Sequence, residues 1–454
     1  MIIGKPGTRE CILQVGKTPG TIVMKDRPGI VKETKGLQLL YADAEGTLYE
    51  DPDYEAAGWD GAGGTLRLTG ENTVTLPEGA DLVLLPGMAP VGWDQGKKKP
   101  VKDIKRVQAG DRLYAVAATL PAGYTRTLLP AYRPHGKADM LGLFGYTAVA
   151  ARDGEFYVAA VQTDETYKWN PLVYNDLTLP KRIKSKKKDL PKNRLVEHLA
   201  GCAQEYHCLT AQNIFYERWE AGIPVSPGCN AECLGCISLQ PSECCAAPQQ
   251  RIKFVPTQAE VVELAVPHLE KGVEPIISFG QGCEGEPLLQ ADLIAAAIRE
   301  MRQRTDRGTI NMNTNAGDTA ALEKLCQAGL DAVRVSMLSA RPDVYEAYHR
   351  PGGFGLDDVR RSLALARRCE LNVSVNLLVM PGLTDRKEET EALFELFREG
   401  WVDMVQLRNL NIDPYHLFRQ LPPGKGEVLG IRKLIESLCS VSGLEVGNYT
   451  HPRK

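Results

Sequence analysis

The chain has 454 residues, with 54 lysines and arginines against 57 aspartates and glutamates, which gives a formal net charge of −3. This length is sufficient for two or three domains, and the near-neutral charge argues against a general attraction to nucleic acids or anionic membranes. No apolar run approaches the about 20 residues that a membrane helix needs, and the segment starting at Met1 is too short and polar for a signal peptide. We therefore expect a soluble, cytoplasmic protein with no membrane partner.

Short runs of β-forming residues separated by glycine and proline dominate the N-terminal third of the chain. The clearest pair is Tyr146–Ala151 and Phe156–Gln162, which flank Asp153-Gly154, a dipeptide that favours a tight hairpin turn. We expect a β-rich domain over residues 1–174, built as a small barrel or sandwich and without a catalytic constellation. The other strand candidates are Cys11–Val15, Thr21–Met24 and Leu37–Tyr41.

A strongly basic segment follows, and we assign residues 175–200 as a linker. Like-charge runs interrupted by proline are typical of solvated or mobile segments. The alternative is a contact with a polyanion such as RNA, a nucleotide or an acidic peptide. No aromatic residue is interleaved with the charges, so nucleic acid is the less favoured partner. The basic residues are Lys181, Arg182, Lys184, Lys186, Lys187, Lys188, Lys192 and Arg194.

Strand and helix patterns alternate through the core that we assign to residues 201–420. Thr257 and Glu260 form a capping box, which predicts a helix over Gln258–Leu269. With a first strand at Ala221–Val225, the pattern gives six βα units, which predict a parallel sheet with right-handed crossovers. Residues 421–454 should add a C-terminal helix and tail or edge strand. The other expected strands are Pro275–Gly280, Thr309–Asn315, Ala332–Leu338, Leu371–Met380 and Met404–Asn411, and the other helices are Leu288–Arg302, Asp318–Ala328, Leu356–Cys369, Arg386–Glu399 and Val428–Cys439.

The most specific motif is the C-x3-C-x2-C loop formed by Cys229, Cys233 and Cys236. Three thiolates in one short loop can hold one face of a metal centre, and iron–sulfur cubes take cysteine thiolates as ligands. Three ligands on a four-iron cube leave one iron open for a substrate or cofactor. The alternatives are three free or buried thiols, or a zinc loop, which would need a fourth ligand from elsewhere in the chain.

Polar residues follow several of the expected parallel strands, at the carboxyl edge of the sheet, where active-site residues lie in βα architectures. The second strand ends in Gly285-Glu286-Pro287, whose glycine permits close approach of a ligand and whose carboxylate can accept hydrogen bonds from an ammonium group. The fifth strand ends instead in an apolar edge at Val379. The third strand supplies Asn313 and Asn315, the fourth Arg334 and Ser336, and the sixth Arg408, Asn409, Asn411 and Asp413.

The cysteine loop resembles the cluster-binding loop of the radical S-adenosylmethionine (SAM) superfamily, and Gly285-Glu286-Pro287 is similar to that family's G-E-P motif. The resemblance implies a partial (βα)6 barrel, a 4Fe-4S cluster on the three cysteines and SAM on the open iron, with the G-E-P motif holding the SAM amino group. By similarity to molybdenum-cofactor cyclases, ribose and carboxylate contacts fall to Asn313, Asn315, Arg334 and Ser336, and Val379 would support adenine. An electron donor such as flavodoxin or ferredoxin is also implied.

The cysteine distribution suggests a second metal centre. Twelve cysteines are many for a reducing compartment, where disulfides are disfavoured, and eight of them lie between residues 202 and 283. Four spare thiols would suffice for an auxiliary iron–sulfur cluster or a zinc site, with Cys283 as a substitute ligand. These thiols are Cys202, Cys208, Cys244 and Cys245.

The sequence therefore predicts a radical SAM enzyme that cleaves SAM reductively to a 5′-deoxyadenosyl radical, which abstracts hydrogen from an unidentified peptide, protein or small molecule. The β-rich domain would recruit or orient that substrate. Two alternatives remain: an RNA-modifying radical SAM enzyme, and an iron–sulfur protein of electron transfer or redox sensing. The second has no need of a G-E-P motif or of polar residues on successive strand ends.

Overall fold

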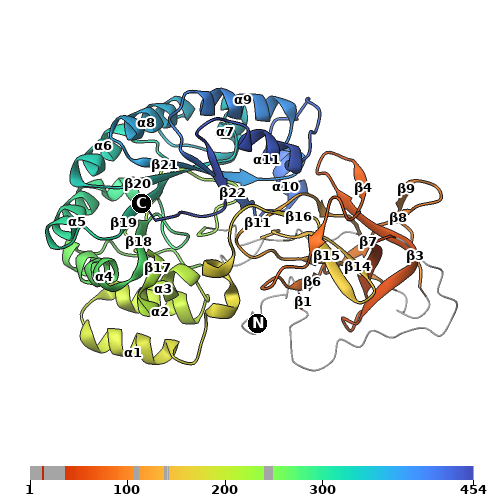
Figure 1. The fold of residues 1–454 in the computed structure, drawn as a ribbon, viewed down its shortest axis with the longest axis horizontal. Coiled ribbons are helices and arrows are strands. Elements are labelled where there is room, and N and C mark those ends of the chain that lie inside the picture. Colours follow the sequence, from red (N-terminus) through yellow and green to blue (C-terminus); the bar gives the residue numbers. More distant parts are fainter. Residues whose placement is uncertain are drawn as a thin grey trace.

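The computed structural model describes residues 13–14, 36–106, 112–136, 141, 143–239 and 249–452. Figure 1 shows two parts side by side: a β-rich part built from the N-terminal third, and a curved parallel sheet with helices on its outer face. The α/β fold with a β-rich N-terminal region agrees with the sequence prediction. None of the described helices is long and apolar enough to cross a membrane.

The N-terminal part is a branched, antiparallel sheet of twelve strands with two additional strand pairs. The predicted hairpin is present: Arg152 pairs with Glu155, and Asp153 and Gly154 form the two-residue turn with positive φ angles of 53° and 81°. The expected run 156–162 is divided between two strands, and expected strand 21–24 lies outside the described residues. The strands are β1 (Leu13–Gln14), β2 (Gln38–Ala42), β3 (Leu48–Trp59), β4 (Thr65–Arg67), β5 (Val74–Thr75), β6 (Leu82–Leu84), β7 (Met88–Pro90), β8 (Gly92–Asp94), β9 (Lys99–Val101), β10 (Tyr114–Ala118), β11 (Tyr124–Arg126), β12 (Leu129–Pro130), β13 (Tyr132–Pro134), β14 (Thr147–Arg152), β15 (Glu155–Val158) and β16 (Ala160–Gln162).

The predicted basic linker over residues 175–200 is wrong, because this segment forms two helices of a folded cap. Leu179 and Ile183, four residues apart on one helix face, are buried, while the lysines lie on the opposite side or pair with acids, as Lys186 does with Glu217. Asn193 caps the second helix by accepting hydrogen bonds from backbone N–H groups. The cap comprises η2 (Tyr167–Trp169), η3 (Pro171–Val173), α1 (Leu179–Asp189), α2 (Arg194–Gln204) and α3 (Leu209–Tyr216).

The C-terminal part is a seven-stranded parallel sheet whose spatial order equals its chain order, from one open edge to the other. The six predicted βα units and the final edge strand are present, and the Thr257–Glu260 capping box is formed in both directions. The first strand begins earlier than expected, at Arg218. The strands are β17 (Arg218–Gly222), β18 (Val273–Phe279), β19 (Thr309–Thr314), β20 (Ala332–Met337), β21 (Asn372–Val379), β22 (Met404–Asn409) and β23 (Glu445–Gly447); the helices are α4 (Gln258–Lys271), η4 (Pro287–Gln290), α5 (Ala291–Arg304), α6 (Thr319–Ala328), α7 (Pro342–His349), α8 (Leu356–Arg368), α9 (Lys387–Arg398), α10 (Pro414–Gln420) and α11 (Ile431–Cys439).

The two parts share a hydrophobic core at the carboxyl ends of β20, β21 and β22, which we call the interdomain core. Trp59 of the N-terminal part stacks on Tyr415 with ring centroids 4.8 Å apart. The fully buried Arg126 of β11 donates through Nη2 to the Leu410 carbonyl oxygen, 2.6 Å away. The N-terminal part therefore packs on the strand-end face of the barrel. The core includes Val83, Leu85, Met88, Leu129 and Phe144 from one side and Leu338, Tyr348, Met380, Leu410 and Leu417 from the other, with Cys233 and Leu234 packed against it.

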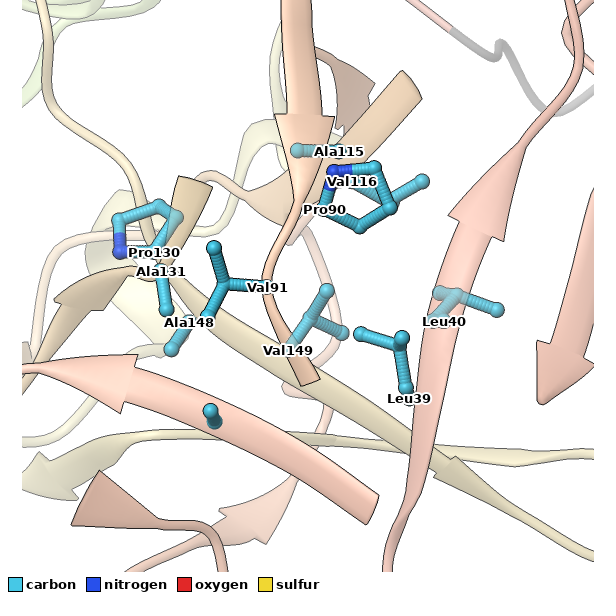
Figure 2. A pocket seen from close by; sticks show the side chains of 11 residues that line it. Leu39, Leu40, Pro90, Val91, Ala115, Val116, Pro130, Ala131, Ala148 and Val149 are labelled. Atoms are coloured by element: carbon cyan, nitrogen blue, oxygen red, sulfur yellow. The ribbon is translucent and has the colours of Figure 1, made fainter. Parts of the chain in front are cut away.

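One cavity inside the N-terminal part is shown in Figure 2. It lies among apolar side chains such as Leu39, Val91, Val116 and Val149, and its volume is about 10 Å³. This volume is at the lower limit for a single water molecule, and the lining offers no polar side chain to hold one. The cavity is therefore a small packing gap and no substrate site.

Candidate metal and cofactor site

The cysteine loop, residues 226–236, leaves the carboxyl end of β17 and docks on the end of α7. The backbone N–H of Leu234 donates to the Tyr348 carbonyl oxygen at 3.0 Å, and Gly352 N–H donates to the Asn230 carbonyl oxygen at 2.7 Å. A Cβ at Gly235 would lie only 2.7 Å from the Tyr348 hydroxyl, so close docking requires glycine there. These contacts hold the loop in a defined position against α7 and the residues that follow it.

Two of the loop thiols, Cys229 and Cys233, occupy an environment that disfavours their own ionisation. Cys229 is exposed, whereas Cys233 and Cys236 are half-buried. Partial desolvation raises the pKa of Cys229, and burial raises the pKa of Cys233 to about 12; the neighbouring cysteines add to both effects. Thiolates at these positions need a nearby positive charge, which a bound metal centre provides.

A four-iron cluster and a single zinc ion require different spacings of their thiolate ligands. Among the described residues, the three loop sulfurs do not form a group whose members all lie within 4.8 Å of one another. A tetrahedral zinc ion with bonds of about 2.3 Å would bring its sulfurs to about 3.8 Å. In a four-iron cube each cysteine binds a different iron, so the sulfurs stay further apart.

Two side chains approach the loop sulfurs as hydrogen-bond donors. His349 places Nδ1 at 3.4 Å from Cys233 Sγ, and its Nε2 accepts from the Leu338 backbone N–H at 3.3 Å. Since Nε2 is the acceptor, Nδ1 carries the proton and points it at the sulfur. Arg251 lies with Nη2 at 3.7 Å from Cys236 Sγ. Neither donor belongs to a sequence motif, because both reach the loop only through the tertiary fold.

The G-E-P turn is joined to the cysteine loop by backbone hydrogen bonds. Gly285 N–H donates to the Ser226 carbonyl oxygen at 2.7 Å, and Glu286 N–H donates to the Gly228 carbonyl oxygen at 2.8 Å. A Cβ at Gly285 would fall 1.8 Å from that second oxygen, so only glycine permits the approach. The structure thus brings the two predicted motifs together at adjacent strand ends.

The Glu286 carboxylate is buried within the turn and is already occupied. It accepts hydrogen bonds from Thr314 Oγ1 and from the backbone N–H groups of Leu288 and Asn315. Three of about four acceptor positions on a carboxylate are therefore used. Burial raises its pKa to about 7. The backbone carbonyls of the turn are consequently better placed than this side chain to receive an ammonium group.

Glu284, which carried no site assignment in the sequence, fastens this turn to the barrel. Its buried carboxylate accepts from the backbone N–H groups of Val225 and Ser226 on one oxygen, and of Gly280 and Gln281 on the other. Burial raises the pKa of Glu284 to about 7, while these four donors oppose the shift. The carboxylate thereby ties the exit of β17 to the exit of β18.

The predicted ribose and carboxylate contacts lie in a polar network inside the barrel. Arg334 Nε donates to Asn313 Oδ1 at 2.6 Å, and its Nη2 lies 3.0 Å from Glu220 Oε1 in a buried ion pair. Asn315 instead reaches the cysteine loop, donating to Asn230 Oδ1 at 2.7 Å. These side chains already satisfy one another, so a ligand would have to exchange with internal hydrogen bonds.

The remaining predicted contacts differ in accessibility. Ser336 is half-buried on the same strand as Arg334, whereas Val379 is fully buried in the barrel core. Complete burial favours a packing role for Val379 over support of adenine. Arg408 at the end of β22 is half-buried, and desolvation, followed by the charge of Arg334, lowers its pKa to about 10. Its guanidinium lies 3.5 Å from Asn448 Oδ1.

The predicted second group of thiols is only partly represented. Cys244 and Cys245 lie outside the described residues. Cys202 and Cys283 lie together in the structure with His198, which the sequence reasoning missed, and Cys208 is close by. A hydrogen bond from Cys283 and the proximity of His198 lower the pKa of Cys202 to about 5.

Comparison with known proteins gives the class of the barrel. Residues 223–395 match the family model of the Radical SAM superfamily, so the chain contains a radical SAM domain. Domains of this class use a 4Fe-4S cluster and SAM.

Named relatives cover only part of the chain. It is 26% identical over 231 residues to the GTP 3′,8-cyclase of Limosilactobacillus fermentum, covering 49% of this chain and 62% of the relative. It is 32% identical over 199 residues to the GTP 3′,8-cyclase of Streptomyces coelicolor, covering 43% of this chain and 54% of the relative. The chain thus spans between half and two thirds of these relatives' lengths. Among solved structures, Streptococcus suis SuiB bound to precursor peptide SuiA is 13% identical, with a TM-score of 0.36 over 68% of this chain and 70% of that one.

Proposed function

We propose that this protein is a radical SAM enzyme whose cluster is held by Cys229, Cys233 and Cys236 and whose SAM lies between that cluster and the G-E-P turn. When bound and reduced, the cluster supplies the electron that cleaves SAM to methionine and a 5′-deoxyadenosyl radical able to abstract hydrogen. The observation that carries the proposal is the pair of backbone hydrogen bonds joining Gly285 and Glu286 to the cysteine loop. These bonds hold the cysteine loop and the G-E-P turn side by side, which supports a shared site for the cluster and SAM.

The chain's own residues would then bind, orient and shield. The loop thiols bind as thiolates, and the carbonyl groups of the G-E-P turn accept from the SAM amino group. His349 and Arg251 donate hydrogen bonds to ligand sulfurs, which stabilises added negative charge. The N-terminal part covers the strand ends of β21 and β22 and would limit access of water to a radical site.

The charge of Arg408 indicates the chemical class of group that this end of the barrel would bind. Arg408 is a half-buried cation at a strand end, and its low-dielectric setting strengthens its attraction for an anion. This favours a substrate or SAM group with a carboxylate or phosphate, and a nucleotide such as the GTP of the named relatives is one candidate. A peptide carrying acidic residues is the second. Electrons would come from a small donor such as flavodoxin or ferredoxin.

The test is the cleavage of SAM by anaerobically reconstituted, dithionite-reduced protein, followed by chromatography for 5′-deoxyadenosine. We expect slow formation of 5′-deoxyadenosine without substrate, and none from a variant with all three loop cysteines changed to alanine. Cys439→Ala is a matched control, because Cys439 is exposed on α11 away from the loop. An intact cluster that yields no 5′-deoxyadenosine with reductant and candidate substrates would favour an iron–sulfur electron carrier instead.

A further inference from the structure

A second set of metal-ligand side chains lies on the helical cap, apart from the cysteine loop. His198 and Cys202 are four residues apart on α2 and therefore share a helix face. Cys283, from the loop after β18, meets them there. The ligand atoms of the three side chains all lie within 4.8 Å of one another, and His198 Nε2 is 3.7 Å from Cys202 Sγ. Cys202 and Cys283 are 2% and 3% exposed, so the group is shielded from solvent.

The composition of this group is that of a zinc site. Zinc takes thiolate and imidazole ligands at about 2.3 and 2.0 Å, which places neighbouring ligand atoms about 3.3–3.8 Å apart. The observed separations approach that range, so small side-chain rotations would close the site. Cys208 is a further thiol close to this group: its backbone N–H donates to the Cys202 carbonyl oxygen at 3.0 Å, and its Sγ lies 3.3 Å from Thr210 Oγ1. Cys208 is not one of the three residues whose ligand atoms all lie within 4.8 Å of one another, so its side chain would have to turn to become the fourth ligand.

The location gives such a site a mechanical role. Cys283 lies two residues before Gly285, and its carbonyl oxygen accepts from the Ile252 backbone N–H at 2.8 Å. The other ligands belong to the cap, which is separate in sequence from the G-E-P turn. A metal bridging them would fix the loop that presents this turn to the cysteine loop.

We propose that His198, Cys202 and Cys283, with Cys208 as the fourth ligand, bind one zinc ion that fastens the helical cap to the loop preceding the G-E-P turn. Zinc has no redox chemistry of its own, so the site is structural. The inference does not depend on the proposed function, because the zinc and its ligands are separate from the three loop cysteines.

The experiment uses the full chain with Cys229, Cys233 and Cys236 changed to alanine, purified anaerobically and without added iron. Elemental analysis should find one zinc per chain. Replacement of the zinc by cobalt should give the visible absorption bands of thiolate-ligated Co²⁺. Adding Cys202→Ser or Cys283→Ser should remove the zinc and these bands, whereas adding Cys326→Ser should not. Cys326 is the matched control, because it also lies beside another cysteine, Cys369, but was not found in a metal-ligand group among the described residues.

His198→Ala tests the site with a variant that keeps the fold, because His198 is only half-buried and its loss leaves the apolar packing of α2 intact. It should weaken zinc binding at least tenfold in a competition with a chromogenic chelator while the circular dichroism spectrum is unchanged. The proposal would be overturned by zinc content that is the same with and without Cys202 and Cys283. Iron in place of zinc, or a Cys202–Cys283 disulfide in the anaerobic protein, would overturn it equally.

Discussion

Changing His349 to phenylalanine should shift the reduction potential of the cluster without removing the cluster. The imidazole Nδ1–H lies 3.4 Å from Cys233 Sγ, and burial lowers the pKa of His349 to about 3, so the ring is a neutral donor. A donor to a ligand sulfur stabilises the more negative, reduced state. A net hydrogen bond is worth about 0.5–1.5 kcal/mol. For a one-electron couple, this corresponds to roughly 20–60 mV.

We therefore expect the midpoint potential of His349→Phe to be roughly 20–60 mV more negative than that of the wild type, with the same iron content. The assay is a potentiometric titration followed by electron paramagnetic resonance of the reduced cluster. His268→Phe is the control. His268 is a buried histidine on the outer helix α4, and its ring bonds to the Trp219 carbonyl oxygen. An unchanged potential in His349→Phe, or an equal shift in the control, would refute the assigned N–H···S bond.

Three further predictions concern the turn, the interdomain core and pH. Gly285→Ala places a Cβ against the Gly228 carbonyl oxygen, so SAM binding by equilibrium dialysis and the melting temperature should both fall; unchanged values would contradict the close approach. Trp59→Ala removes the stack on Tyr415 and should cost about 2 kcal/mol in urea unfolding, and a loss near zero would show that the two parts are not packed as described. Burial lowers the pKa of His268 to about 4, whereas this histidine in the unfolded chain takes up a proton below about pH 6.5, so the free energy of unfolding falls toward pH 4. Between pH 7 and pH 5 the wild type should lose about 2 kcal/mol more of this free energy than His268→Gln. Equal losses in the two proteins would contradict the burial of a neutral His268.

The barrel was predictable because its signals are local. The Thr257–Glu260 capping box needs only neighbouring residues, and the structure forms it as expected. The end of α6 is local in the same way, because Gly329 closes it with a positive φ angle of 103°. The C-x3-C-x2-C and G-E-P motifs could be read for the same reason. Their mutual contact was anticipated only by the rule that parallel strands end on one face.

The misinterpreted segments depend on distant partners. Helix α1 contains two buried apolar residues, Leu179 and Ile183, among many lysines. The burial of these two side chains in the cap, and not the run of like charges, determines that the segment folds as a helix. Strand β17 begins with polar residues, which do not have the apolar pattern expected of a buried strand. One of them, Glu220, pairs inside the barrel with Arg334, which lies 114 residues away in the sequence. His198 lacked any motif with Cys283 and became visible only when the fold brought them together.

Electron paramagnetic resonance of the reduced, reconstituted protein with and without SAM tests the proposed cofactor site most directly. We expect a reduced four-iron signal whose line shape changes when SAM is added, because in the proposed site SAM binds the iron that the three loop cysteines leave open. Replacing all three cysteines with alanine should abolish that signal. A signal that SAM does not alter, or one that survives in the triple variant, would contradict the proposed site.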